Sequence, residues 1–187
     1  MINTQNREEK KLGMLKTILK VFAAKGLENT SMRNLSAELK INISSLYEYF
    51  NSKEELVISC AKYYMEKLDR KFEREYKKIP PDLKTEMKLI FDMIVKEKAN
   101  LRFIYQVISS PMYGARGREE LEPIYTNYLR FSDKLADSYG ISRERFEEAF
   151  LLFIATVHDF CLWDNREFVN KKLNCIYYLI DKELENK

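Results

Sequence analysis

The chain has 187 residues, of which 45% are hydrophobic and 33% charged, and this composition is typical of a soluble globular protein. No apolar run approaches the roughly 20 residues of a membrane-spanning helix, and the polar start MINTQNREEKK lacks the apolar core of a signal peptide. We therefore expect a cytoplasmic protein without membrane contact, and the small numbers of glycine and proline favour long helices.

The positive charge is concentrated near the N-terminus. Residues 1–53 contain nine Lys or Arg and five Asp or Glu, a balance of +4, whereas residues 54–187 have a balance of −1. An excess of basic residues on a small segment suits contact with nucleic-acid phosphates, although lysine-rich helices are more often simply solvated.

The first predicted helices lie between Met14 and Leu56. The helical spacing of Leu15, Ile18, Leu19 and Phe22 predicts one apolar face, which Gly26 ends as a C-terminal cap. A second helix is predicted to begin at Ser31, whose hydroxyl can accept a bond from a first-turn amide, and to bury Met32, Leu35 and Leu39.

A turn at residues 40–42 leads to a third predicted helix. We expect Asn42 to cap it, with Leu46 and Phe50 facing inward. Ser52 and Glu55 then form a capping-box pattern that opens a long fourth helix. Two helices joined by so short a turn cross steeply, and the second of them can enter a DNA major groove.

These residues carry a resemblance to a known family. The motifs are Phe22-x-x-x-Gly26-Leu27, Thr30-Ser31, Arg33 with Leu35, and Leu46-Tyr47-x-Tyr49-Phe50-x-Ser52-Lys53-Glu54-x-Leu56. The segment resembles the DNA-binding domain of the tetracycline-repressor (TetR) family over about a quarter of the chain. Lys40 departs from the glycine usual at its turn position. A left-handed backbone would cost a lysine about 1 kcal/mol, so we expect a slightly altered turn.

The resemblance implies an all-α protein with a three-helix helix-turn-helix DNA-binding domain at residues 1–53. Residues 54–187 would form a helical domain that binds an effector and dimerises. The implied function is a transcriptional regulator, in particular a repressor that binds a palindromic DNA operator as a homodimer and is released by a small organic effector. The alternative is a coactivator or scaffold with the same fold that does not read DNA.

The resemblance also assigns DNA contacts by position. The groove contacts would be Asn42, Ile43, Ser44, Ser45 and Tyr47 on the third helix, and the phosphate contacts would be Thr30, Ser31, Tyr49 and Lys53. Because the third helix has no Arg, Lys or Gln, Arg33 on the second helix is the candidate for reading guanine. The alternatives are core packing for the two tyrosines and a merely solvated Lys53.

The remaining chain predicts further helices. One covers residues 53–77 and ends before Pro80-Pro81, and another covers 82–98 with Asp82 as its cap. A shorter helix at 101–109 stops at Pro111, Gly114–Gly117 is predicted as a flexible loop, and a helix at 118–139 contains Pro123 and ends at Gly140. The last two helices, at 143–163 and 166–184, are the expected dimer interface, and Ser142 is expected to cap the first of them. A monomer with one central helix is the alternative.

An aromatic-rich region predicts the effector pocket. Aromatic walls with few polar groups suit an apolar or aromatic organic ligand, although most such side chains in any protein belong to the core. The candidate lining residues are Tyr64, Ile90, Ile94, Phe103, Tyr125, Tyr128, Phe153 and His158.

Cysteine and histidine give little sign of catalysis. Cys60, Cys161 and Cys175 are far apart and fit thiols in a reducing compartment. His158 lies three residues before Cys161, so a metal or nucleophile site is the alternative to a core cysteine beside a structural or pocket histidine. The chain has no phosphate loop, paired carboxylates or triad, so we predict that it is not an enzyme and uses no metal or cofactor.

Overall fold

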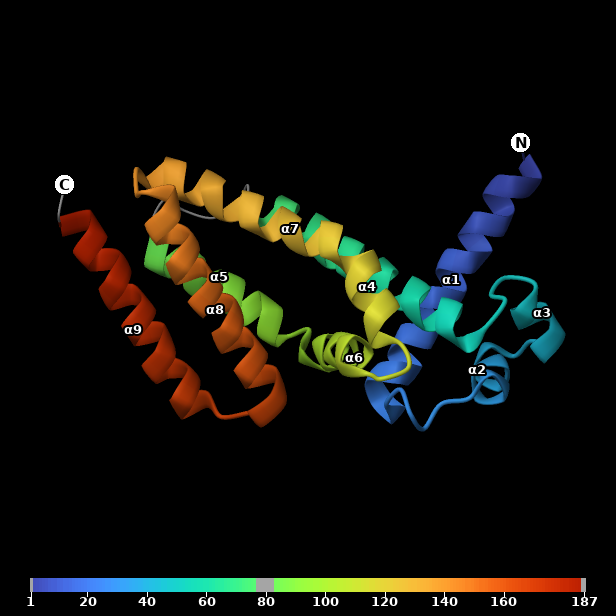
Figure 1. Ribbon diagram of the computed structural model, residues 1–187. Helices are drawn as coiled ribbons and strands as arrows, with labels where there is room; N and C mark the ends of the chain where they lie inside the picture. Colours follow the sequence, from blue (N-terminus) through green and yellow to red (C-terminus); the bar gives the residue numbers. More distant parts are fainter. Residues whose placement is uncertain (1, 77–82, 186–187) are drawn as a thin grey trace. The chain divides into compact units, whose positions relative to one another are not determined.

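The computed structural model describes residues 2–76 and 83–185 (Figure 1). Within these ranges the regular elements are helices, as predicted: α1 Ile2–Lys25, α2 Met32–Leu39, α3 Ile43–Tyr47, α4 Lys53–Tyr76, α5 Leu83–Val95, α6 Lys98–Ser109, α7 Gly114–Tyr139, α8 Arg143–Trp163 and α9 Arg166–Glu185. None of the described helices is both long and apolar enough to cross a membrane. The expected break at Pro80-Pro81 and the expected cap Asp82 lie outside the described residues.

The chain forms two compact units. The first contains Met1–Lys71 and Ala99–Pro123, and the second contains Phe72–Lys98 and Ile124–Lys187. Both α4 and α7 therefore contribute residues to each unit. The predicted functional boundary at residue 53 falls inside the first unit, because the beginning of α4, most of α6 and the beginning of α7 are grouped with α1–α3.

The core of the first unit joins α1–α3 to α4 and α6. The predicted inner residues of α1–α3 are buried except Leu39, which is only half-buried, and the first turn of α4 adds two more. The buried residues are Leu15, Ile18, Leu19, Phe22, Met32, Leu35, Leu46, Phe50, Leu56 and Val57. Phe22 of α1 stacks on Phe103 of α6, with ring centroids 4.9 Å apart and planes 6° from parallel. This stack makes α6 part of the core that supports the N-terminal helices.

The helix caps follow the sequence patterns in part. Gly26 ends α1 with a φ of 81°, and Gly140 follows α7 with a φ of 63°, as predicted. Ser31 caps α2 through a capping box with Asn34. Asn42 and Ser142 stand at the N-cap positions of α3 and α8, but their side chains make no capping hydrogen bond, so the predicted caps are wrong in this respect.

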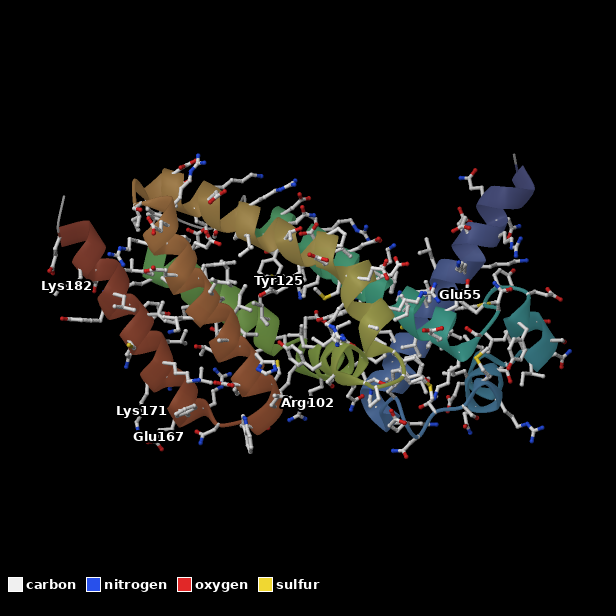
Figure 2. All side chains as sticks on the ribbon, viewed as in Figure 1. Glu55, Arg102, Tyr125, Glu167, Lys171 and Lys182 are labelled. Atoms are coloured by element: carbon white, nitrogen blue, oxygen red, sulfur yellow. The ribbon has the colours of Figure 1, made fainter. Side chains whose placement is uncertain are left out.

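The start of α4 differs in one detail from the predicted capping box. The Ser52 hydroxyl accepts a hydrogen bond from the Glu55 amide at 3.0 Å, as predicted. The Glu55 carboxylate accepts bonds from the Asn51 backbone and side-chain nitrogens, both at 2.9 Å. The Glu55 side chain, labelled in Figure 2, therefore bonds to the backbone of Asn51, one residue before the N-cap Ser52 that a capping box would use.

The predicted glycine loop is wrong. Gly114 and Gly117 lie in the first turns of α7, which begins four residues before the predicted start at Arg118. A Cβ atom at Gly114 would lie 2.8 Å from the Ile108 carbonyl oxygen, and one at Gly117 would lie 3.0 Å from Val107 Cγ1. The two glycines therefore allow close packing of α7 on α6.

The second unit is built around α5 and α8. Phe91 of α5 meets Phe153 and Phe160 of α8 edge to face, with centroids 6.3 and 5.8 Å apart. Helices α8 and α9 lie side by side (Figure 1). Beyond its buried residues, α8 exposes Leu151, Leu152, Leu162 and Trp163, so its apolar side chains do occupy several faces as the sequence predicts. In the same way, α9 exposes Phe168, Tyr178 and Leu179.

Candidate nucleic-acid interface

Helices α2 and α3 are joined by a tight turn at Lys40. Lys40 has φ 57° and ψ 40°, and its amide donates to the Ala37 carbonyl at 3.0 Å. The Ile41 amide donates to the Ser36 carbonyl at 3.0 Å. These two bonds satisfy the last carbonyls of α2. The left-handed conformation is therefore kept with a lysine in place of glycine, and no altered conformation is seen at this residue.

Helix α3 presents a surface of hydroxyl and apolar groups. Leu46 is fully buried, whereas Ile43 is 42% and Tyr47 45% exposed. Asn42 and Ser44 are also exposed, and Ser45 is half-buried. Ile43 and Tyr47 are one turn apart and can meet thymine methyl groups, while Ser44 can donate to or accept from a base edge.

The predicted contacts on and before α2 differ in their exposure. Arg33 is exposed on α2. The Ser31 hydroxyl is used in the capping box, where it accepts a hydrogen bond from the Asn34 backbone N–H at 3.1 Å. Thr30 is only 1% exposed, and its hydroxyl donates to the Gly26 carbonyl at 2.8 Å. The predicted phosphate contact by the Thr30 side chain would thus require this loop to change.

Tyr49 and Lys53 both have partners within the protein. The guanidinium carbon of Arg7 lies 5.6 Å from the centroid of the half-buried Tyr49 ring. Lys53 Nζ donates to the Leu27 carbonyl at 3.3 Å and lies 6.0 Å from the Tyr113 ring centroid. This carbonyl explains why a cation is tolerated at the start of α4, where the helix dipole opposes it.

Two basic residues next to α3 do not belong to the predicted set. Arg7 donates to the Glu48 carbonyl at 2.8 Å, and Lys11 Nζ lies 5.4 Å from the Phe50 ring centroid. Both belong to α1, which begins at Ile2 although its apolar spacing starts only at Leu15. Their spacing of four residues places them on one helix face, and this is the signal that could have found them.

Polar contacts connect the DNA-binding motif to α6 and α7 within the first unit. The Leu27 amide donates to the Gln106 side chain of α6 at 3.3 Å. Lys62 of α4 pairs with Glu120 of α7 at 2.8 Å. Arg116 of α7 lies 3.7 Å from Glu54 of α4, so the beginning of α4 is bracketed by two ion pairs.

The predicted effector residues are divided between the two units. Tyr64 and Phe103 are buried in the first unit, and Ile90, Ile94 and Phe153 are buried in the second. Tyr125, labelled in Figure 2, is 44% exposed on α7. His158 is half-buried, with its Nδ1 3.8 Å from a carboxylate oxygen of Asp159. The Tyr128 side chain lies outside the described residues.

The proposed alternative site at His158 has no cluster of ligands. Cys161 is fully buried, and the described residues contain no group of three or more His, Cys, Asp or Glu that could hold a metal ion. Asp159 pairs with Lys172 and lies beside His158. The arrangement is an ordinary ion-pair network on α8 and α9.

Comparison with known proteins supports the sequence resemblance. Residues 14–60 match the family described as bacterial regulatory proteins, tetR family. The chain is 43% identical over 61 residues to the HTH-type transcriptional regulator YuxN of Bacillus subtilis, a match that covers 33% of this chain and 21% of that protein. The chain thus matches only about a fifth of the length of this curated relative.

Solved structures share the fold over nearly the whole chain. A TetR-family regulator of Streptomyces coelicolor, SCO4454, has a TM-score of 0.68 at 15% identity, covering 96% of this chain and 97% of its own. FadR of Bacillus subtilis, solved in complex with stearoyl-CoA, has a TM-score of 0.64 at 19% identity, covering 87% and 95%. Residues 14–60 thus match the DNA-binding segment of the TetR family, and the chain shares the all-α fold of these solved structures.

Proposed function

We propose that the protein is a ligand-responsive repressor that binds a palindromic DNA operator as a homodimer and is released by a small organic effector. The exposed surface of α3, with Ile43, Ser44 and Tyr47, carries the proposal. Residues 1–53 supply the DNA-binding domain, and residues 54–187 supply effector binding and dimerisation. A two-fold dimer presents two such helices to successive major grooves on one side of the duplex.

The base contacts follow from the chemistry of α3 and α2. Apolar Ile43 and the Tyr47 ring read thymine methyl groups, and Ser44, Ser45 and Asn42 form hydrogen bonds with base edges. Arg33 supplies guanine recognition. The phosphates are contacted by Ser31, Tyr49 and Lys53, together with the loop at Thr30. Because phosphate positions depend on the shape of the duplex, these contacts make part of the sequence specificity depend on DNA shape.

The effector is an apolar or aromatic organic molecule held by the helices after residue 53. FadR of Bacillus subtilis is seen in complex with stearoyl-CoA, and the multidrug binding protein EbrR, with a TM-score of 0.65 and 13% identity, is seen in complex with imidazole. The candidate residues of the first unit are the buried Tyr64 and Phe103, and those of the second unit are the buried Ile90, Ile94 and Phe153. Tyr125 and His158, which are also candidates, belong to the second unit.

Selection of DNA from a random duplex library tests the function. The purified full-length protein should enrich an inverted repeat, and a gel shift with DNA upstream of its own gene should show a shifted band. Arg33→Ala and Ser45→Ala should change which bases are enriched. Lys53→Ala should weaken all duplexes about equally and reduce the slope of log affinity against log salt by about one per half-site.

The coactivator or scaffold function remains the second candidate because α3 has no Arg, Lys or Gln, the residues that most often make bidentate base contacts. It predicts that the folded protein enriches no duplex and binds DNA only at low salt. Enrichment of an inverted repeat would exclude it. Absence of enrichment, with a correctly folded dimer, would exclude the repressor function.

A further inference from the structure

The beginning of α1 extends beyond the segment that defines the family. Helix α1 starts at Ile2, whereas the matched segment starts at residue 14. The extension contains Arg7, whose Nη2 donates to the Glu48 carbonyl oxygen at 2.8 Å and whose guanidinium lies 5.6 Å from the Tyr49 ring centroid. One arginine thus contacts the two residues that directly follow α3.

Helix α3 needs support at its ends. It has five residues, Ile43–Tyr47, and a helix of this length is unstable without tertiary contacts. At its start, the Asn42 side chain makes no capping bond. At its end, Glu48 is the C-cap, and carbonyl groups there lack helical partners and carry partial negative charge. A cationic donor at the Glu48 carbonyl supplies the missing hydrogen bond and also offsets the negative partial charge at this helix end.

We propose that Arg7 is a positioning residue for DNA recognition: it holds the C-terminal end of α3 through the Glu48 carbonyl and the Tyr49 ring, and so fixes the direction in which Ile43 and Tyr47 project. The proposal rests on the DNA-binding function proposed above. Arg7 acts here through the protein backbone, in contrast to a lysine or arginine that binds phosphate directly.

Amide hydrogen exchange of the full-length protein without DNA tests the contact itself. In Arg7→Ala, the amides of residues 46–50 should exchange about threefold faster, the size expected for a cation at an exposed helix C-terminus. The amides of α2 should keep their wild-type rates. Lys10→Ala is the matched control, because Lys10 is an exposed cation of the same extension that makes no hydrogen bond or ion pair with the described residues.

DNA binding separates positioning from a general structural role. The probes are the inverted repeat that the wild-type protein selects and a random duplex pool. Arg7→Ala should reduce the ratio of the two affinities about tenfold, because a threefold loss at each of two half-sites multiplies. A merely structural role would lower the folded fraction and weaken both probes equally. Arg7→Lys should restore part of the ratio, since an ammonium can still donate to the carbonyl.

Four results would overturn the assignment. A salt slope that falls by about one per half-site in Arg7→Ala would show a direct phosphate contact. Unchanged exchange rates at residues 46–50, or an unchanged affinity ratio on a selected repeat, would show that Arg7 does not position α3. If the wild-type protein selects no duplex at all, the proposed function itself fails and the recognition role of Arg7 fails with it, a result distinct from the other three.

Discussion

Lys40 has a left-handed backbone conformation, with a φ of 57°, in the turn between α2 and α3. The hydrogen bonds from the Lys40 and Ile41 amides join backbone atoms only, so they do not use the lysine side chain. A residue with a Cβ atom is strained in this conformation, whereas glycine is not. The turn between α2 and α3 is therefore less stable in this chain than it would be with glycine at this position.

Replacing Lys40 by glycine should stabilise the protein. We expect Lys40→Gly to raise the free energy of unfolding by about 1 kcal/mol, because the strain of the left-handed conformation disappears. Urea denaturation followed by circular dichroism measures the change. Lys40→Ala, which keeps the Cβ atom, is the control and should show no such gain. Equal stabilisation by alanine and glycine would attribute the effect to the lost charge.

Glu86 is an acid in the core of the second unit. It lies on α5 with 3% of its surface exposed and accepts a hydrogen bond from the Tyr139 hydroxyl of α7. Burial raises the pKa of Glu86 above its ordinary value, and the bond from Tyr139 opposes this rise in part. A folded-state pKa above the unfolded one means that the folded state holds the proton more tightly.

The stability should therefore depend on pH through Glu86. The destabilisation caused by the buried charge is complete above the raised folded-state pKa and disappears as the pH falls toward the unfolded value. Glu86→Gln should accordingly be more stable than the wild type at neutral pH, with the difference vanishing in acid. Tyr139→Phe should lower the free energy of unfolding at neutral pH, because the buried carboxylate of Glu86 then loses its hydrogen bond. Urea titrations at a series of pH values measure the free energy of unfolding of each variant. A difference in stability between Glu86→Gln and the wild type that does not change with pH would contradict this account of Glu86.

At the scale of helices, apolar spacing predicted most elements but not their ends. The inner faces of α1–α3 and the all-α fold could be predicted because period and caps depend on local residues. The glycines before Arg118 were predicted as a loop because glycine usually interrupts helices. In the structure they lie where α7 approaches α6. The close approach of α7 to α6 is a tertiary contact, so a local sequence pattern cannot predict it.

Two helical glycines should respond in opposite ways to alanine. Gly114→Ala should destabilise the protein by more than about 1 kcal/mol, because its Cβ would lie 2.8 Å from a backbone oxygen, which cannot move aside like a side-chain tip. Gly13→Ala in α1 has no atom within 4 Å of the new Cβ and should stabilise by about 0.5–1 kcal/mol. Thermal unfolding of both variants gives the comparison. Destabilisation by both would contradict the packing role of Gly114.

The DNA contacts remain a prediction, and only the exposure of the residues assigned to them can be compared with the sequence. The exposure of Arg33, Ile43 and Tyr47 agrees with positions assigned from the motif. The contact from Arg7 was not predictable because it joins residues 41 positions apart across two helices. Burial of the Thr30 hydroxyl was equally hidden, since threonine at a helix start is common both as a cap and as a phosphate ligand.

On the scale of the whole molecule, α8 and α9 leave apolar side chains exposed. Leu152 is 48% exposed on α8, and Leu179 is 42% exposed on α9. Ile176 is only 2% exposed, so a charge there would disturb the core of one protomer and would not test association. Exposed apolar residues on two neighbouring helices are the feature expected of an interface that the second protomer covers.

The double substitution Leu152→Glu with Leu179→Glu should produce folded monomers. The change places charge on the exposed face while leaving the buried residues of the unit in place. Light scattering at micromolar concentration should give the dimer mass for the wild type and the monomer mass for the variant, with unchanged helical circular dichroism. Leu12→Glu, a 49% exposed leucine of α1, is the matched control and should remain dimeric. A monomeric wild type would reject the proposed assembly.

The stack of Phe22 on Phe103 has a practical consequence for dissecting this protein. A fragment ending at residue 53 would lose Phe103 and Gln106, and would expose a ring that now has 1% of its surface in contact with solvent. Uncovering an aromatic ring of this kind costs roughly 1.5–3 kcal/mol, a large share of the stability of so short a chain. Hybrid regulators that graft this recognition helix onto a foreign sensor would therefore need to carry α6 along, or to supply an aromatic substitute at its position.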